Sequence, residues 1–206
     1  MLEIKIKDTT YTGKHILKET TLSELEACLN IANKKETFDY DYVDKTADIL
    51  SIITDIPNDI LLNISINEIK RIYDKLSDDN EVETKTLKGT ITIGDETFIL
   101  YNTNGQDQDF TEYEIYRGPF KRIRKAFADK KPDWIKRALA SMYSNDQEEY
   151  IQLVRLLKQN DFETGIFLPV ILKVIETVAI QTGEEYNIYS KLDENKPNEN
   201  ESKKEV

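Results

Sequence analysis

The residues best suited to bind a ligand by charge lie between Arg117 and Arg137. This stretch, RGPFKRIRKAFADKKPDWIKR, holds nine basic and two acidic residues, a net charge of +7, although the whole chain carries −11. We call it the basic segment. Its cations, which we predict to form a partner-binding surface, are Arg117, Lys121, Arg122, Arg124, Lys125, Lys130, Lys131, Lys136 and Arg137.

Three interpretations of the basic segment are open. Its cations alternate with Phe120, Phe127 and Trp134, a pattern that can follow a phosphate backbone and stack on bases. The same cations could dock an acidic protein or another copy of this chain. They could also form a solvated helix face that pairs with acidic regions of the same chain. Because Phe120, Ile123 and Phe127 share one helical face, the spacing favours core packing, with the cations on the flanks and outer face.

The chain offers few groups for catalysis. His15 is the only histidine and Cys28 the only cysteine, so neither a His/Cys zinc set nor an internal disulfide is available. No glycine spacing matches a phosphate-binding loop. Cys28 lies in an apolar helical stretch, which indicates an inert buried thiol. His15 falls in a predicted strand. We therefore expect a protein that is not an enzyme, with no cofactor and no metal.

Paired carboxylates are the remaining candidates for a metal site. Asp39 and Asp41 would share one face of an extended segment, and Asp107 and Asp109 fall in a predicted loop over 102–109. Such pairs can hold Mg²⁺ or Ca²⁺. Neither pair has the DxDxDG pattern, and clusters arise readily in a chain with 39 acidic residues, so we assign no metal to them.

The elements that position these residues form an α+β fold, mainly helical, with two small antiparallel β-hairpins. Leu2, Ile4 and Ile6 alternate with charged residues, and Tyr11–Leu17 could return as the second strand. The second hairpin runs from Leu87 to Tyr101 around Gly94-Asp95-Glu96. The pattern leaves open whether the two hairpins join in one sheet.

Helix boundaries are predicted from caps and prolines. Thr21 to Glu24 and Ser65 to Glu68 are capping boxes. A helix over 43–54 stops before Pro57, and a short helix covers 58–62. From Phe110 the chain is predicted to be helical. The helix begins at 111–116, Gly118-Pro119 bends or restarts it, Pro132 opens another helix, and Asp146 can cap the next one. The last helix, ended by Gly183, is apolar on several faces, so we expect it to be central.

These elements are predicted to form one α+β domain over 1–189, with an N-terminal half over 1–101 and a helical half over 110–189. Residues 190–206 form a polar, acidic tail that we expect to be disordered alone. The N-terminus lacks the apolar core of a signal peptide, and no run approaches the roughly 18 apolar residues of a membrane span. We therefore expect no membrane association and a location in a cytoplasm.

Four short phrases, in this order, resemble a phage family. They are Ile49–Ile56 (ILSIITDI), Ile93–Phe98 (IGDETF), Phe110–Tyr113 (FTEY) and Leu139–Tyr143 (LASMY). Together with the helices around them they cover about residues 22–178. This layout is similar to that of tailed-phage tail assembly chaperones and virion morphogenesis proteins.

The resemblance implies a non-enzymatic protein that binds a phage structural protein during virion assembly in the host cytoplasm. Edge strands of the hairpins and grooves between helices would hold an extended apolar segment of that partner. Two alternatives stay open. The chain could be a structural component retained in the virion, contacting other copies of itself, or it could bind nucleic acid through the basic segment. The family has no catalytic residues to transfer.

Overall fold

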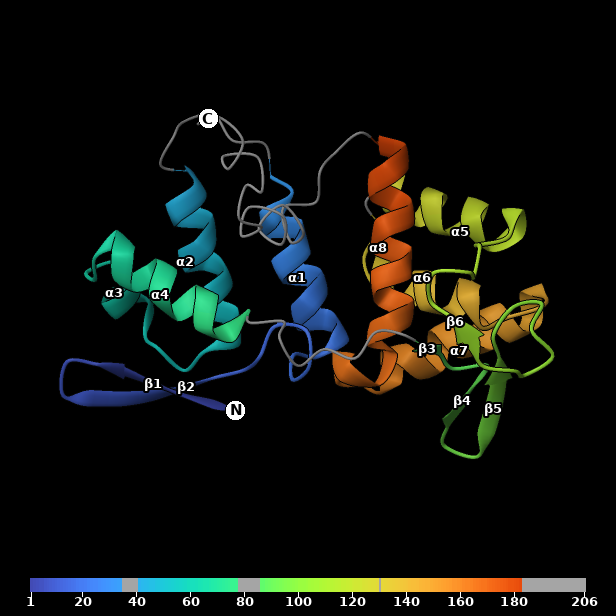
Figure 1. The fold of residues 1–206 in the computed structure, drawn as a ribbon, viewed down its shortest axis with the longest axis horizontal. Helices are drawn as coiled ribbons and strands as arrows, with labels where there is room; N and C mark the ends of the chain where they lie inside the picture. Colours follow the sequence, from blue (N-terminus) through green and yellow to red (C-terminus); the bar gives the residue numbers. More distant parts are fainter. Residues whose placement is uncertain (35–40, 78–85, 130, 183–206) are drawn as a thin grey trace, which may run out of the picture.

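The computed structural model describes residues 1–34, 41–77, 86–129 and 131–182, with only the helical backbone of Asp41 and of 177–182. This part of the chain contains eight α-helices, one 3-10 helix and three two-stranded antiparallel sheets. The mainly helical α+β fold predicted from the sequence is confirmed. Figure 1 shows two groups of elements with the long α8 between them.

The first group holds one hairpin and four helices. They are β1 (Leu2–Ile6), β2 (Thr9–Gly13), α1 (Leu22–Ala32), α2 (Asp41–Ile53), α3 (Asn58–Leu61) and α4 (Ile66–Leu76). Ile4 and Ile6 are buried, as their alternation predicted. The second strand ends at Gly13 and does not continue to Leu17. Beyond it the chain bonds to helix ends, since the amide of Lys14 donates to Ile53 O and that of Ile16 to Leu76 O.

The two predicted capping boxes differ. Thr21 and Glu24 form the reciprocal pair at the start of α1, so that prediction is confirmed. At α4 the Ser65 hydroxyl accepts the Glu68 amide, but the Glu68 carboxylate accepts two bonds from Arg71 at 2.6 and 3.0 Å. The second box is therefore only half formed, because a charged guanidinium is a stronger donor than a backbone amide.

The second group holds the remaining strands and helices. They are β3 (Thr86–Leu87), β4 (Thr90–Ile93), β5 (Glu96–Ile99), β6 (Gln108–Asp109), α5 (Arg117–Ala128), α6 (Trp134–Met142), α7 (Gln147–Gln159), the 3-10 helix η1 (Thr164–Phe167) and α8 (Leu168–Thr182). The β1–β2 and β4–β5 hairpins are separate sheets. The pairing of β3 with β6 was not predicted, since residues 102–109 were interpreted as a loop.

The helical half begins later than the sequence indicated. The Asp109 carboxylate accepts the amides of Thr111 and Glu112, which holds these residues in a turn rather than a helix. α5 starts at Arg117, and Pro119 lies in its first turn, where a missing N–H costs nothing. The prediction of a helix over 111–116 was therefore wrong. Of the two outcomes predicted at Gly118-Pro119, a bend or a restart, the restart is confirmed, because α5 begins there.

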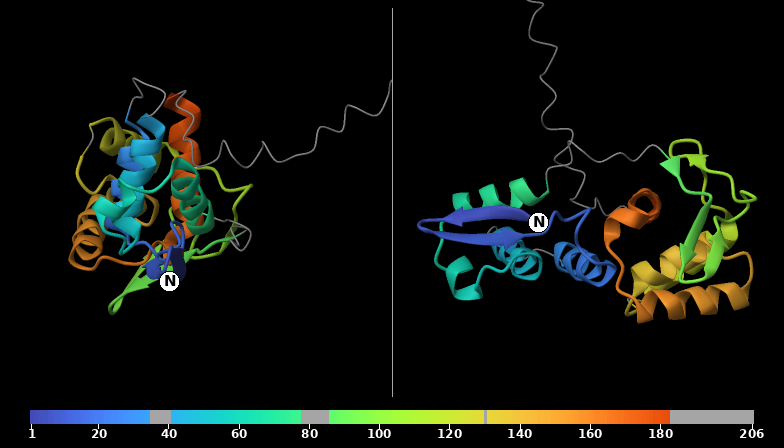
Figure 2. Two further views of the ribbon diagram at one scale, coloured as in Figure 1. Left: turned by 90° about the vertical axis from the view of Figure 1, so that its left-hand side faces the viewer. Right: turned by 90° about the horizontal axis from the view of Figure 1, so that it is seen from below.

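α8 is central, as predicted. Its buried side chains are Leu168, Val170, Ile171, Leu172, Val174 and Ile175. Because these positions occupy more than one face, α8 packs against several elements, and Figures 1 and 2 show it between the two groups. The predicted end at Gly183 and the tail over 190–206 lie outside the described residues.

The two groups are joined by α1 and the chain around η1. The amide of Leu22 donates to Phe162 O at 2.9 Å, and that of Thr164 donates to Thr20 O at 2.7 Å. The β4–β5 hairpin lies with the C-terminal helices, although we had grouped it with the N-terminal half. For example, the side-chain amide of Gln152 in α7 donates to the Glu96 carboxylate in β5.

Candidate partner-binding surface

The basic segment is divided between α5 and α6. In α5, Pro119, Ile123 and Ala126 are buried against the rest of the fold. The opposite side of the helix carries Arg117, Lys121, Arg124 and Lys125, all exposed and spaced four, three and one residues apart. This spacing places the four cations along one stripe of a 3.6-residue helix.

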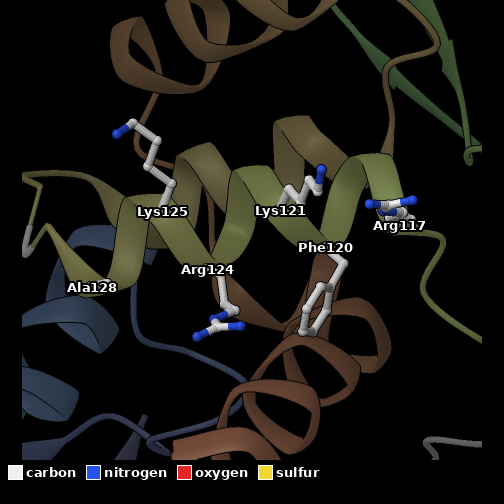
Figure 3. Close-up of a pocket in the computed structure, with 6 residues that line it drawn as sticks. All are labelled: Arg117, Phe120, Lys121, Arg124, Lys125 and Ala128. Carbon is white, nitrogen blue, oxygen red and sulfur yellow. The ribbon is translucent and has the colours of Figure 1, made fainter.

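An open hollow of about 420 Å³ runs along this stripe. We call its lining the α5 face, which consists of Arg117, Phe120, Lys121, Arg124, Lys125 and Ala128. In Figure 3, Lys121 and Lys125 point to one side of the helix and Phe120 and Arg124 to the other. Phe120 is half-buried, so the face combines four cations with one partly accessible aromatic ring.

Three of these cations have no counter-charge among the residues that the structure describes. Lys125 lies 3.5 Å from the Asp129 carboxylate. None of the described residues forms an ion pair or a hydrogen bond with the side chains of Arg117, Lys121 or Arg124. Their charge is therefore available to a ligand, and it is concentrated on one side of an acidic protein.

Arg122 belongs to the interior of the fold. Its Nη2 donates to Ser144 O at 3.3 Å and Ser141 O at 3.4 Å, near the C-terminal end of α6. Its guanidinium carbon also lies 5.4 Å from the centre of the Tyr150 ring. A cation at this end of a helix satisfies free carbonyls and opposes the helix dipole. Arg122 therefore ties α5 to α6.

The other cations of the basic segment are placed elsewhere. Lys136 is only 5% exposed, and its ammonium lies 2.9 Å from Ser23 Oγ and 3.2 Å from the Asp161 carboxylate. Arg137 Nε donates to Pro132 O at 3.2 Å. Lys131 lies 3.7 Å from the carboxylate of Asp129. Lys130 is outside the described residues. The nine predicted residues therefore do not form one surface, and the α5 face holds four of them.

The aromatic residues of the basic segment are divided in the same way. Trp134 is 3% exposed and its indole N–H donates to Asn30 Oδ1 at 3.3 Å. Phe127 packs edge-on against it, with ring centres 5.2 Å apart. Only Phe120 lines the hollow. We had assigned Phe120 to the core. Its spacing with Arg117, Lys121 and Arg124 is the signal that could have placed it on the α5 face.

The carboxylate pairs have structural roles. Asp107 accepts the Gly89 amide at 2.8 Å and the Lys88 ammonium at 2.9 Å, and these bonds hold its pKa below the usual range. Asp109 caps the turn at Thr111. Asp41 begins α2 and is not extended, while Asp39 lies outside the described residues. Within the described ranges, no group of three or more His, Cys, Asp and Glu side chains could hold a metal ion.

His15 and Cys28 lie in the interior. His15 is 8% exposed and follows β2 instead of lying in it, and its Nδ1 accepts the Leu17 amide at 3.2 Å. Cys28 is buried in α1, and this burial raises the pKa of its thiol to about 12. The thiol is therefore protonated at neutral pH, and a protonated buried thiol is a poor nucleophile.

The sheet edges differ in how they are covered. On β1, the carbonyls of Glu3 and Lys5 accept bonds from Lys75 and Arg71 of α4. The end of β2 pairs with Thr54. No hydrogen bond from a described residue outside the hairpin reaches the backbone of Thr92 or Thr97, in β4 and β5. An extended peptide could therefore pair with the second hairpin at Thr92 or Thr97 without displacing a hydrogen bond from another described residue.

Among the helices that the structure describes, none combines the length and the apolar character needed to cross a membrane. Comparisons of the chain with protein-family models, with curated proteins and with solved structures found no match.

Proposed function

We propose that this protein is a non-enzymatic morphogenesis protein, similar to tailed-phage tail assembly chaperones, that binds a structural partner protein in the host during virion assembly. The α5 face is its docking surface, and the partner contributes an acidic segment. The observation that carries the proposal is a set of three cations, Arg117, Lys121 and Arg124, around the half-buried Phe120. None of the three pairs with a described part of the chain.

Electrostatics supports a protein partner of this kind. A net charge of −11 keeps the molecule soluble and repels other acidic surfaces, so the α5 face is the region that attracts them. Arginine with a neighbouring aromatic ring is a frequent combination at the energetic centre of protein interfaces. The uncovered edges of β4 and β5 offer a second place for an extended part of the same partner.

Nucleic acid is a weaker alternative. Base stacking needs accessible rings, and of the three aromatic residues in the basic segment Trp134 is buried and Phe127 packs against it. Phe120 alone is left for stacking on the α5 face. The four exposed cations could still contact phosphates, which is why the experiment below includes an oligonucleotide.

A structural role in the virion is the other alternative. Residues 86–116 contain one basic and six acidic residues, a net charge of −5. The α5 face of one copy could contact this acidic region of the next copy in a head-to-tail assembly. Mass spectrometry of purified particles separates the two roles, because a chaperone is absent from the finished particle and a structural component is present.

The test is co-expression with candidate long structural proteins encoded in the same genome as this chain. We expect a complex that keeps the partner soluble. The K121E/R124E variant should bind the partner at least about tenfold more weakly, a loss of roughly 1.4 kcal/mol. The matched control, K5E/K70E, changes net charge equally at two exposed positions outside the α5 face and should bind normally. If the partner's solubility is unchanged and no complex forms, the proposal is wrong.

A salt titration separates protein from nucleic-acid binding. We expect poly-L-glutamate to bind the wild-type protein and a 20-nucleotide thymidine strand to bind weakly, with little dependence on salt. A steep loss of oligonucleotide affinity with increasing salt, absent in K121E/R124E, would instead favour nucleic acid.

A further inference from the structure

The chain that follows α8 has the chemistry to bind the α5 face. The described part of α8 reaches Thr182, and the residues that follow it in the sequence are Gly183 and then Glu184–Tyr189, with the sequence EEYNIY. This hexapeptide contains two acidic residues, two tyrosines and an isoleucine. We call it the acidic-aromatic segment. The α5 face presents the complementary set, with cations flanking a half-buried phenylalanine.

The middle of α8 lies close to α5 through α6. Val174 and Ile175 of α8 pack against Trp134, which contacts the Phe127 ring near the end of α5. In the view of Figure 1, α5 lies to the right of α8, level with the upper half of that helix. A six-residue extended segment spans about 20 Å, and α5, with 12 residues, is about 18 Å long. The segment is therefore long enough to lie along the stripe of cations.

The acidic-aromatic segment can make two kinds of favourable contact with the α5 face. Glu184 and Glu185 can accept charge-assisted hydrogen bonds from Arg117, Lys121 or Arg124. The two tyrosine rings can stack on guanidinium or ammonium groups. Because the segment is attached to the same molecule, its effective concentration is on the order of millimolar, so even a weak contact is populated.

We propose that the acidic-aromatic segment, residues 184–189, docks on the α5 face of its own chain and competes there with the partner. This inference rests on the proposed function only where it names the partner as competitor. If the segment docks in cis, an acidic ligand can bind only those molecules whose α5 face is free. The apparent affinity for the ligand is then the intrinsic affinity multiplied by that free fraction. It also shields the cations from other acidic proteins until the proper partner displaces the segment.

The direct test places a nitroxide label beside the segment in the full chain. Cys28 is buried, so a cysteine introduced by Ser190→Cys is labelled selectively. We expect loss of the amide NMR signals of Arg117–Ala128 at low salt. The signals should return in about 0.5 M NaCl, where screening leaves a Debye length of roughly 4 Å. They should also return in K121E/R124E but not in the control K5E/K70E.

A second measurement uses competition. The variant E184Q/E185Q, with two charges removed from the segment, should bind poly-L-glutamate roughly threefold or more tightly than the wild type. The matched control E199Q/E201Q removes two charges outside the segment and should bind as the wild type does. If α5 signals are retained at low salt, or if their loss is the same in K121E/R124E, the inference is wrong.

The two proposals can fail separately. Binding of the structural partner through the α5 face, without loss of α5 signals in the labelled protein, overturns the docking in cis and leaves the proposed function standing. Loss of α5 signals that depends on Lys121 and Arg124, in a protein that binds no structural partner, supports the docking in cis and overturns the proposed function.

Discussion

Substituting Glu26 by alanine should destabilise the fold, because this α1 residue caps a helix that is distant in the sequence. Its carboxylate accepts the amide of Asp133 at 2.7 Å and that of Ile135 at 3.0 Å, at the start of α6. Asp133 does not cap its own helix. It has a left-handed backbone with φ of 60°, and its carboxylate lies 2.6 Å from the Lys158 ammonium.

The size of the effect follows from these contacts. Each partly buried amide left without an acceptor costs about 1 to 3 kcal/mol, with the lower end appropriate where water can reach. Loss of the negative charge at the start of α6 adds about 0.5 kcal/mol. The alanine variant also avoids the cost of burying a charged carboxylate, and this gain offsets part of the loss in stability. We therefore expect the free energy of unfolding to fall by about 2 to 3 kcal/mol in Glu26→Ala. The fall should be about 1 kcal/mol in Glu26→Gln, which keeps one acceptor oxygen.

Urea unfolding followed by circular dichroism measures this change in the full chain. Glu112→Ala is the control, since Glu112 is an exposed turn residue, and its effect should stay within about 0.5 kcal/mol. If Glu26→Ala unfolds at the same urea concentration as the control, water must bind the amides of Asp133 and Ile135 as well as the carboxylate does, with no loss of stability. The assignment of Glu26 as the cap that stabilises α6 would then be refuted.

Further predictions concern pH, thiol reactivity and two glycines. Burial raises the pKa of Glu26, so the folded state binds its proton more tightly than the unfolded state does. The stability that this tighter proton binding contributes is fully present below the pKa of Glu26 in the unfolded state. It is lost as pH rises through the pKa of Glu26 in the folded state. Urea titrations should therefore show the wild type losing stability relative to Glu26→Gln as the pH rises above about 4, near the pKa of a glutamate in an unfolded chain. With the pKa of its thiol near 12, Cys28 should react with an aromatic disulfide reagent only at the rate of unfolding; rapid reaction of folded protein would contradict its burial. A Cβ at position 89 would lie 2.3 Å from the Gln106 carbonyl, so Gly89→Ala should lower the melting temperature, whereas Gly118→Ala, in an open part of α5, should raise stability by about 0.5 kcal/mol.

Local features of the fold could be predicted from the sequence because they depend on near neighbours. The capping pair of Thr21 and Glu24 lies within one helical turn, and Asp146 caps α7 by accepting the Glu148 and Glu149 amides. The central place of α8 also follows from its own composition. Such features need no knowledge of how distant segments meet.

The division of the basic segment could not be predicted from the sequence. Nine cations within one stretch look equivalent, yet Lys136 is buried against Ser23 and Asp161 while Lys121 is exposed. These outcomes depend on α1 packing against α6, a contact between residues more than 100 positions apart. Periodicity reports which face of a helix is apolar, but not which distant carboxylate will meet a cation.

The sequence by itself determined the fold class, most helix caps and the presence of a basic segment in an acidic chain. Only the tertiary structure decided that four of its cations, with Phe120, line one hollow along α5, and that Arg122 and Lys136 instead make contacts within the fold. The physical reason is that the amino-acid composition sets how many cations the chain carries, whereas the residues packed around each cation decide whether that cation has a counter-charge. Those surroundings exist only after α1, α5, α6 and α7 have packed together.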